Sequence, residues 1–133
     1  MSGYLFDTSA LLLAVLESSR FSNSARRSTS LGNRFISQVA AIEITIKTSI
    51  GRLALPEPFK LDFSSAFLLA AHSLEATILA IGMEDISRLA SLPLHHRDPF
   101  DRLMIAQAIG ADLTLVTSDR ALARYEGLKV LEI

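Results

Sequence analysis

The chain has 133 residues, half of them hydrophobic, with no cysteine; 13 Lys and Arg against 14 Asp and Glu give a formal net charge of −1. The length predicts one domain over residues 1–133, the missing cysteine excludes disulfides and thiolate chemistry, and the charge excludes an overall basic field. No apolar stretch approaches the roughly 20 residues that span a bilayer. Residues 1–7 lack the basic segment of a signal peptide, so we expect a cytoplasmic protein without membrane contact.

Short apolar runs alternate with helical patterns along the chain. In order, they predict a strand at residues 4–6, a helix at 10–19, a short helix within 20–33, a strand at 34–36 and a helix at 38–50. An extended connection at 53–58 precedes a helix at 64–74, a strand at 77–81, helices at 84–92 and 99–110, a strand at 113–117, a short helix at 120–125 and a strand at 129–133. This alternation predicts an α/β fold with a parallel sheet.

Four acidic residues fall where an apolar run ends or a helix begins: Asp7, Glu43, Asp101 and Asp119. The turns that follow parallel strands meet at one edge of the sheet, so distant residues can converge there. Two carboxylates about 4 Å apart repel by roughly 4 kcal/mol at an effective dielectric of 20, so a cluster of four requires a cation. Oxygen ligands favour Mg²⁺ or Mn²⁺. We therefore expect one shared metal site.

Each acid also has an ordinary structural explanation. Asp7 and Asp119 suit helix N-caps, and Asp101 suits the third helical position, where it complements the helix dipole. Glu43 can pair with Lys47 one turn later. Singly these explanations are adequate, but together they would gather like charges at one edge of the sheet. The metal site accounts for all four.

Other catalytic patterns are absent from the sequence. His72, His95 and His96 lack the spacing of zinc ligands, although His96 lies in a loop where it could touch substrate. There is no nucleophile-elbow serine and no phosphate-binding glycine loop. A phosphatase with Asp7 as nucleophile is a rival, but haloacid-dehalogenase-like enzymes need a second Asp where Ser9 stands.

Three arginines flank the turns that carry the acids: Arg97, Arg102 and Arg120. Guanidinium groups bind the phosphates of a nucleic-acid backbone, so an acidic pocket with a cationic rim suits a phosphodiester. We expect these arginines to contact RNA. The alternative is that they are solvated surface residues.

An ordered set of motifs covers nearly the whole chain: Leu5–Leu12, Ile36–Ser37, Glu43–Lys47, Gly51–Leu53, Leu94–Ala108 and Leu113–Asp119. A lone Asp-Thr-Ser would carry no information, but the set with these spacings is specific. Through it the chain resembles the PIN-domain ribonucleases and, more narrowly, the VapC toxins of bacterial toxin–antitoxin pairs. The resemblance implies a PIN-like three-layer α/β/α fold with a central, mainly parallel sheet.

The resemblance also implies an endoribonuclease that uses Mg²⁺ or Mn²⁺ and leaves a 5′-phosphate. It would act as a homodimer and be inhibited by a cognate VapB-type antitoxin. Metal binding and catalysis would fall to Asp7, Glu43, Asp101 and Asp119, with accessory roles for Asp98, Thr117 and Ser9.

The chain departs from its relatives near these positions. Related toxins commonly have His where Ser9 stands, Trp where Leu13 and Ile42 stand, and Ser where Ala40 stands. None of these changes removes an expected metal ligand. The alternative function is a catalytically silent PIN-like module that binds RNA or a protein, which the presence of all four acids disfavours.

Overall fold

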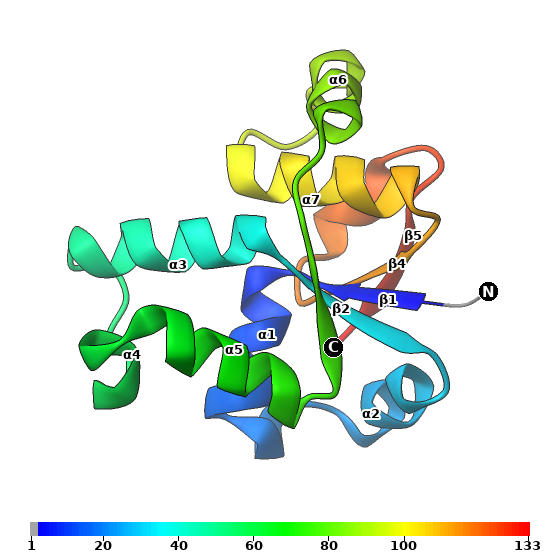
Figure 1. Ribbon diagram of the computed structural model, residues 1–133. Helices are drawn as coiled ribbons and strands as arrows, with labels where there is room; N and C mark the ends of the chain where they lie inside the picture. The colour runs from blue at the N-terminus through cyan, green and yellow to red at the C-terminus, as the bar shows by residue number, and fades with distance from the viewer. Residues whose placement is uncertain (1–2) are drawn as a thin grey trace.

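A central sheet of five parallel strands, in the order β3-β2-β1-β4-β5, organises the molecule (Figure 1). The computed structural model describes residues 3–133. Met1 and Ser2, which belong to the predicted domain 1–133 and to the segment 1–7 considered above as a signal peptide, lie outside the described residues. The strands are β1 (Gly3–Phe6), β2 (Asn33–Ser37), β3 (Ala76–Leu79), β4 (Thr114–Thr117) and β5 (Lys129–Glu132). All of them run the same way, so their carboxyl ends share one edge.

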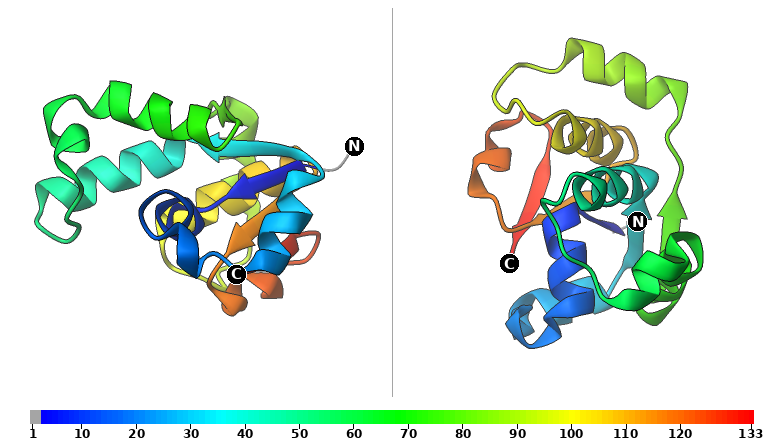
Figure 2. Two further views of the ribbon diagram at one scale, coloured as in Figure 1. Left: turned by 90° about the horizontal axis from the view of Figure 1, so that it is seen from below. Right: turned by 90° about the vertical axis from the view of Figure 1, so that its left-hand side faces the viewer.

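Helices connect the strands and cover both faces of the sheet, which confirms the three-layer α/β/α prediction. In Figure 1, α6 and α7 lie above the sheet and α1, α2 and α5 below it, while α3 and α4 project beyond the strand ends (Figures 1 and 2). The helices are α1 (Thr8–Leu16), α2 (Asn23–Ser30), α3 (Gln38–Ser49), α4 (Glu57–Leu61), α5 (Phe63–Ser73), α6 (Met83–Ser91) and α7 (Pro99–Gly110), with 3-10 turns η1 (Ser18–Arg20) and η2 (Arg120–Arg124).

The core joins the middle strands to α7 and α1. Leu5, Ile36 and Leu115 on the strands and Met104 and Ile105 on α7 are all 0% exposed. Burying each such side chain contributes roughly 1.5–3 kcal/mol. β1 is the centre of this core, because Leu5 pairs with Phe35 of β2 on one side and with Leu115 of β4 on the other.

Most predicted elements are confirmed to within a few residues, including Asp98 as the N-cap of α7 with Pro99 at its first position. The predicted helix at 10–19 is shorter, since α1 ends at Leu16 and a 3-10 turn follows. The predicted extended connection at 53–58 was wrong in its last residues, where α4 begins at Glu57. Pro58 is tolerated there because the backbone N–H groups of the first helical turn have no acceptor within the helix, so the N–H that proline lacks would form no helical hydrogen bond.

Within residues 3–133, none of the helices has the length and apolar character needed to cross a bilayer.

Candidate active site

A pocket of about 360 Å³ lies where β1 and β4 end and α7 begins. Its lining includes all four predicted metal ligands, Asp7, Glu43, Asp101 and Asp119, together with the predicted accessory residues Asp98 and Ser9. The other lining residues are Thr8, Leu12, Lys47, Arg52, Leu53 and Ser118. Residues from four separate parts of the sequence therefore meet in one cavity.

Asp7 is held at the floor of the site by the sheet itself. Its backbone N–H donates to the Val116 carbonyl at 3.0 Å, and its carboxylate caps α1 by accepting from Ala10 N–H at 2.9 Å. Ser9 Oγ donates to the same oxygen at 2.8 Å. Burial raises the pKa of the Asp7 carboxyl, although hydrogen bonds from Thr117, Ala10 and Ser9 favour its charged form.

Glu43 lies in the middle of α3 and is 3% exposed. The Thr8 hydroxyl donates to its Oε1 at 2.5 Å, and Lys47, one helical turn later, forms an ion pair with Oε2. The hydrogen bond to Glu43 raises the pKa of the Lys47 ammonium, and the negative charges of Asp98 and Asp101 act in the same direction. Glu43 thus forms the ion pair with Lys47 that its helical spacing allows, and it also lies in the pocket with the other acids.

Asp98 and Asp101 sit on the first turn of α7. Asp98 Oδ1 accepts from the N–H groups of Phe100 at 2.8 Å and Asp101 at 3.2 Å, which orients the turn toward the pocket. Burial raises the pKa of the Asp101 carboxyl to about 7, and the negative charges of Asp98, Asp7 and Glu43 add to this shift. Burial and, after it, the repulsion of neighbouring carboxylates therefore both disfavour the charged form of Asp101.

Asp119 follows β4 and caps η2 by accepting from Ala121 N–H at 2.9 Å. The Thr117 hydroxyl, which is fully buried, accepts from the Asp119 N–H at 3.0 Å and hydrogen-bonds to the Asp7 carboxylate. Thr117 thus links two of the acids. Ser9 is also tied to this turn, because Ser118 Oγ donates to Ser9 Oγ at 3.0 Å.

His96, which the sequence singled out only as a possible substrate contact, lies directly between two acids. Its Nε2 is 3.1 Å from Asp101 Oδ2 and 3.4 Å from Asp119 Oδ2. Within residues 3–133, no group of three or more acidic or histidine side chains has the geometry to ligate one ion. The acids share the pocket, but Glu43 is paired with Lys47, whereas Asp101 and Asp119 contact His96.

None of the three predicted rim arginines lines this pocket. The Arg102 guanidinium points to the loop before α7, where it donates to the carbonyls of Pro93 at 3.0 Å and His96 at 3.4 Å. Arg120 is 85% exposed and pairs with Glu132 at 2.7 Å. Arg97 is exposed and is also outside the lining.

The cations that do line the pocket are Lys47 and Arg52. Arg52 is brought there by the end of α3, where Gly51 adopts a left-handed φ of 75°. Gly51 N–H donates to Thr48 O at 3.2 Å and Arg52 N–H to Lys47 O at 2.8 Å, the pair of bonds that defines a Schellman cap. The sequence indicated that Lys47 can pair with Glu43, four residues earlier on one helical face, but not that Lys47 lines a pocket.

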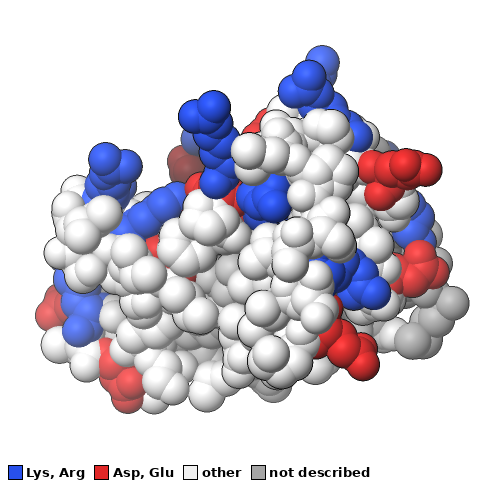
Figure 3. Space-filling view, turned by 90° about the horizontal axis from the view of Figure 1, so that it is seen from above, with Lys and Arg blue, Asp and Glu red and all other residues white. Residues whose placement is uncertain are grey.

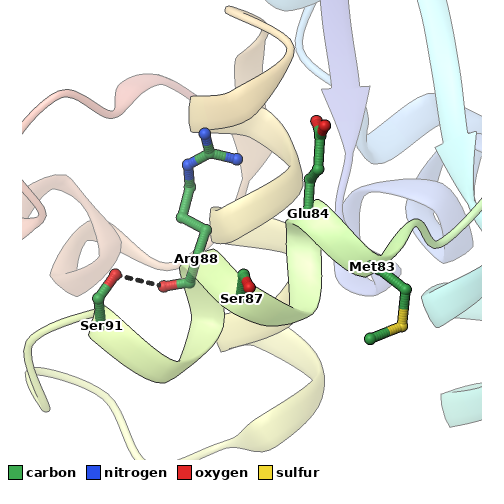
Figure 4. Close-up of a pocket in the computed structure, with 5 residues that line it drawn as sticks. All are labelled: Met83, Glu84, Ser87, Arg88 and Ser91. Atoms are coloured by element: carbon green, nitrogen blue, oxygen red, sulfur yellow. Dashed lines mark hydrogen bonds between the residues drawn. The ribbon is translucent and has the colours of Figure 1, made fainter.

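A larger hollow of about 540 Å³ lies beside α6 (Figure 4). It is lined by residues of that helix alone, namely Met83, Glu84, Ser87, Arg88 and Ser91. It contains none of the predicted acids. On the face above the sheet, positive and negative side chains are interspersed instead of forming one basic patch (Figure 3). Neither feature competes with the acidic pocket as a reaction site.

The family model described as PIN domain matches residues 4–128. No curated protein sequence is significantly similar to the chain. Among solved structures, a chain of VapBC2 from Rickettsia felis, bound to a DNA fragment from its promoter, superposes with a TM-score of 0.72 at 16% identity, covering 98% of both chains. A chain of DNA-bound VapBC from Salmonella typhimurium gives 0.69 at 14% identity, covering 99% of this chain and 98% of that one.

A chain of a toxin–antitoxin complex from Klebsiella pneumoniae gives a TM-score of 0.59 at 20% identity, covering 98% of this chain and 99% of that one. At such identities the likeness concerns the fold. The family model, in contrast, spans nearly the whole sequence, including the segments that carry Asp7, Glu43, Asp101 and Asp119. The chain belongs to the PIN-domain family.

Proposed function

We propose that the chain is a metal-dependent endoribonuclease that hydrolyses RNA phosphodiester bonds. The observation that carries this proposal is the single pocket lined by Asp7, Glu43, Asp101 and Asp119. Four carboxylates in one cavity are a poor surface for RNA by themselves, because they repel phosphates. They make chemical sense if a divalent cation joins them to the substrate.

Mg²⁺ or Mn²⁺ is the cofactor we propose. Asp7, Glu43, Asp101 and Asp119 would hold it, and their carboxylates would have to move closer together than they lie here. Carboxylate oxygens are the ligands these ions prefer. The raised pKa of Asp101 supports the assignment, because a divalent cation would offset the burial and the repulsion that disfavour the charged carboxylate. When bound, such an ion polarises a phosphoryl oxygen and lowers the pKa of water.

The chain's own residues supply binding and orientation. Lys47 and Arg52 give the acidic pocket a cationic side, on which we propose that the phosphates next to the cleaved bond lie. Asp98, Ser9 and Thr117 are the accessory residues, because their hydrogen bonds fix the first turn of α7 and the carboxylate of Asp7. Arg97, Arg102 and Arg120 lie outside the lining of the pocket, so they are not among the phosphate contacts we propose.

A toxin of a type II toxin–antitoxin pair is the biological role we propose. Its support is the fold likeness to chains of VapBC and related toxin–antitoxin complexes, together with the motif set of the sequence. A cognate VapB-like antitoxin would then block the acidic pocket, and the toxin would act as a homodimer in the cytoplasm, where its RNA is found.

The test is cleavage of total bacterial RNA by the purified chain with Mg²⁺ or Mn²⁺, beside an EDTA control and the Asp7→Asn and Asp101→Asn variants. We expect discrete fragments from the wild type and none from the controls, with both variants folded by circular dichroism. Full cleavage by either variant would contradict the site assignment.

A catalytically silent RNA- or protein-binding module is the second candidate. The observation in its favour is the engagement of the acids by Lys47 and His96 within the described chain. It predicts RNA retention without metal-dependent fragments, so the same experiment separates the two functions.

A further inference from the structure

The imidazole of His96 joins two acids that belong to different elements. Asp101 is on the first turn of α7, and Asp119 follows β4. Nε2 of His96 lies 3.1 Å from the Oδ2 of Asp101 and 3.4 Å from the Oδ2 of Asp119. One nitrogen therefore contacts both carboxylates.

One hydrogen bond to the ring shows which nitrogen is the acceptor. Nδ1 accepts the backbone N–H of Asp98 at 3.3 Å, so it has a lone pair and no hydrogen. In the neutral ring the hydrogen then lies on Nε2, the nitrogen that contacts both carboxylates. Within residues 3–133, no hydrogen bond is found at the other oxygen of Asp101, which leaves Oδ1 able to take a further ligand.

Two groups hold the backbone of His96 from opposite sides. The hydroxyl of Tyr125, a residue that is 2% exposed, accepts the His96 N–H at 2.9 Å. The Arg102 guanidinium donates to the His96 carbonyl at 3.4 Å, and also to Leu89 O at 3.5 Å and Leu92 O at 3.4 Å. A loop residue fixed at its N–H, its carbonyl and both ring nitrogens is pre-organised to a degree that a solvated histidine is not.

We propose that His96 is a positioning residue of the metal site. Its Nε2, in contact with both carboxylates, orients Asp101 and Asp119, and the hydrogen bonds of Tyr125 and Arg102 to its backbone hold the imidazole in place. The proposal rests on the metal-dependent function proposed above. Carboxylates that ligate a metal are themselves held by hydrogen bonds, and loss of such a partner typically lowers metal affinity about 10- to 100-fold.

The test is the dissociation constant for Mn²⁺ alone, measured by electron paramagnetic resonance without RNA. His96→Leu fills similar space without a donor and should weaken Mn²⁺ binding about 10- to 100-fold. His96→Gln carries an amide N–H near the position of Nε2 and should recover most of the loss. His72→Leu, a change of the same kind at an exposed residue of α5, is the matched control and should bind Mn²⁺ like the wild type.

Tyr125→Phe provides a second variant that keeps the buried ring and removes only the acceptor of the His96 N–H. It should weaken Mn²⁺ binding in the same direction, and by less, with thermal unfolding checked for each variant. Wild-type affinity in both His96→Leu and Tyr125→Phe would overturn the proposal. So would tighter binding by His96→Leu, which would mean that the imidazole competes with the ion. A wild-type chain that binds no Mn²⁺ would instead contradict the metal-dependent function itself.

Discussion

The Thr8 hydroxyl donates a 2.5 Å hydrogen bond to the Glu43 carboxylate, and both side chains are buried. The contact joins the first residue of α1 to the middle of α3. The carboxylate of a proposed metal ligand is therefore held by Thr8, a residue of the first motif for which the sequence predicted no role in the site.

Replacement of Thr8 by Val keeps the shape of the side chain but leaves the buried carboxylate without this donor. Hydrogen bonds to charged groups contribute roughly 1.5–3 kcal/mol, so the free energy of unfolding in urea should fall by about that amount, and RNA cleavage should fall with it. Thr8→Ser retains the hydroxyl and should restore most of both. Equal stability of the Val variant and the wild type would show that this hydrogen bond contributes little.

The pH dependence of stability should carry the signature of Asp101. Because its pKa is raised from 3.8 to about 7, the folded chain binds this proton more tightly than the unfolded chain does. Unfolding then releases a proton between these pH values, and stability in EDTA should decrease as the pH rises from about 4 to 7. The raised pKa of Asp7 acts in the same direction.

Thermal melts from pH 4 to 8 would measure this effect. In the Asp101→Asn variant the melting temperature should decrease less with rising pH, and at pH 8 in EDTA it should exceed that of the wild type. The variant should not cleave RNA. Asp62→Asn is the control, because the Ser65 hydrogen bonds lower the pKa of that exposed carboxyl. A wild-type melting temperature that rises steadily from pH 4 to 7 would argue against a raised Asp101 pKa.

Binding of single-stranded RNA should depend on Arg52 and not on Arg120. Arg52 lines the acidic pocket, whereas Arg120 lies outside it and pairs with Glu132. Loss of one phosphate contact reduces the steepness of log K against log salt by roughly 0.7 for single strands. Arg52→Ala should show this change and Arg120→Ala should not, as measured by fluorescence anisotropy with the inactive Asp7→Asn protein. A reduced salt dependence in Arg120→Ala and not in Arg52→Ala would instead support the prediction from sequence that Arg120 contacts RNA.

Gly51→Ala should destabilise the end of α3. A residue with a Cβ costs roughly 1–2 kcal/mol in the left-handed conformation that Gly51 adopts. No atom lies within 4 Å of a Cβ added there, so the cost comes from the backbone and not from crowding. Gly51→Asn should lose less, because Asn tolerates this conformation. Urea unfolding of the two variants tests the order, and an Ala variant as stable as the wild type would contradict it.

The strand-to-helix turns were predictable because their signals are local. Asp98 before Pro99 indicates the start of α7 without reference to the rest of the chain, and the structure confirms it. The gathering of the acids in one pocket followed from topology, since parallel strands end at a common edge.

The cations were harder to predict because adjacency in sequence differs from adjacency in space. Arg102 directly follows Asp101, but consecutive residues on a helix do not share a face, and its guanidinium turns to the loop carbonyls. Lys47 shares a face with Glu43, so the helical spacing did contain that signal. The place of His96 between Asp101 and Asp119 depends on contacts from Tyr125, a residue with no motif of its own.

The central position of β1 also determines when the pocket can exist during synthesis. Asp7 follows the strand that is made first, yet its backbone N–H bonds to β4, one of the last strands to be made. A nascent chain must therefore keep β1 available until β4 inserts beside it, a long-range closure that slows folding. Until β4 is in place, Asp119 is missing from the pocket, so the acidic residues come together only late in folding.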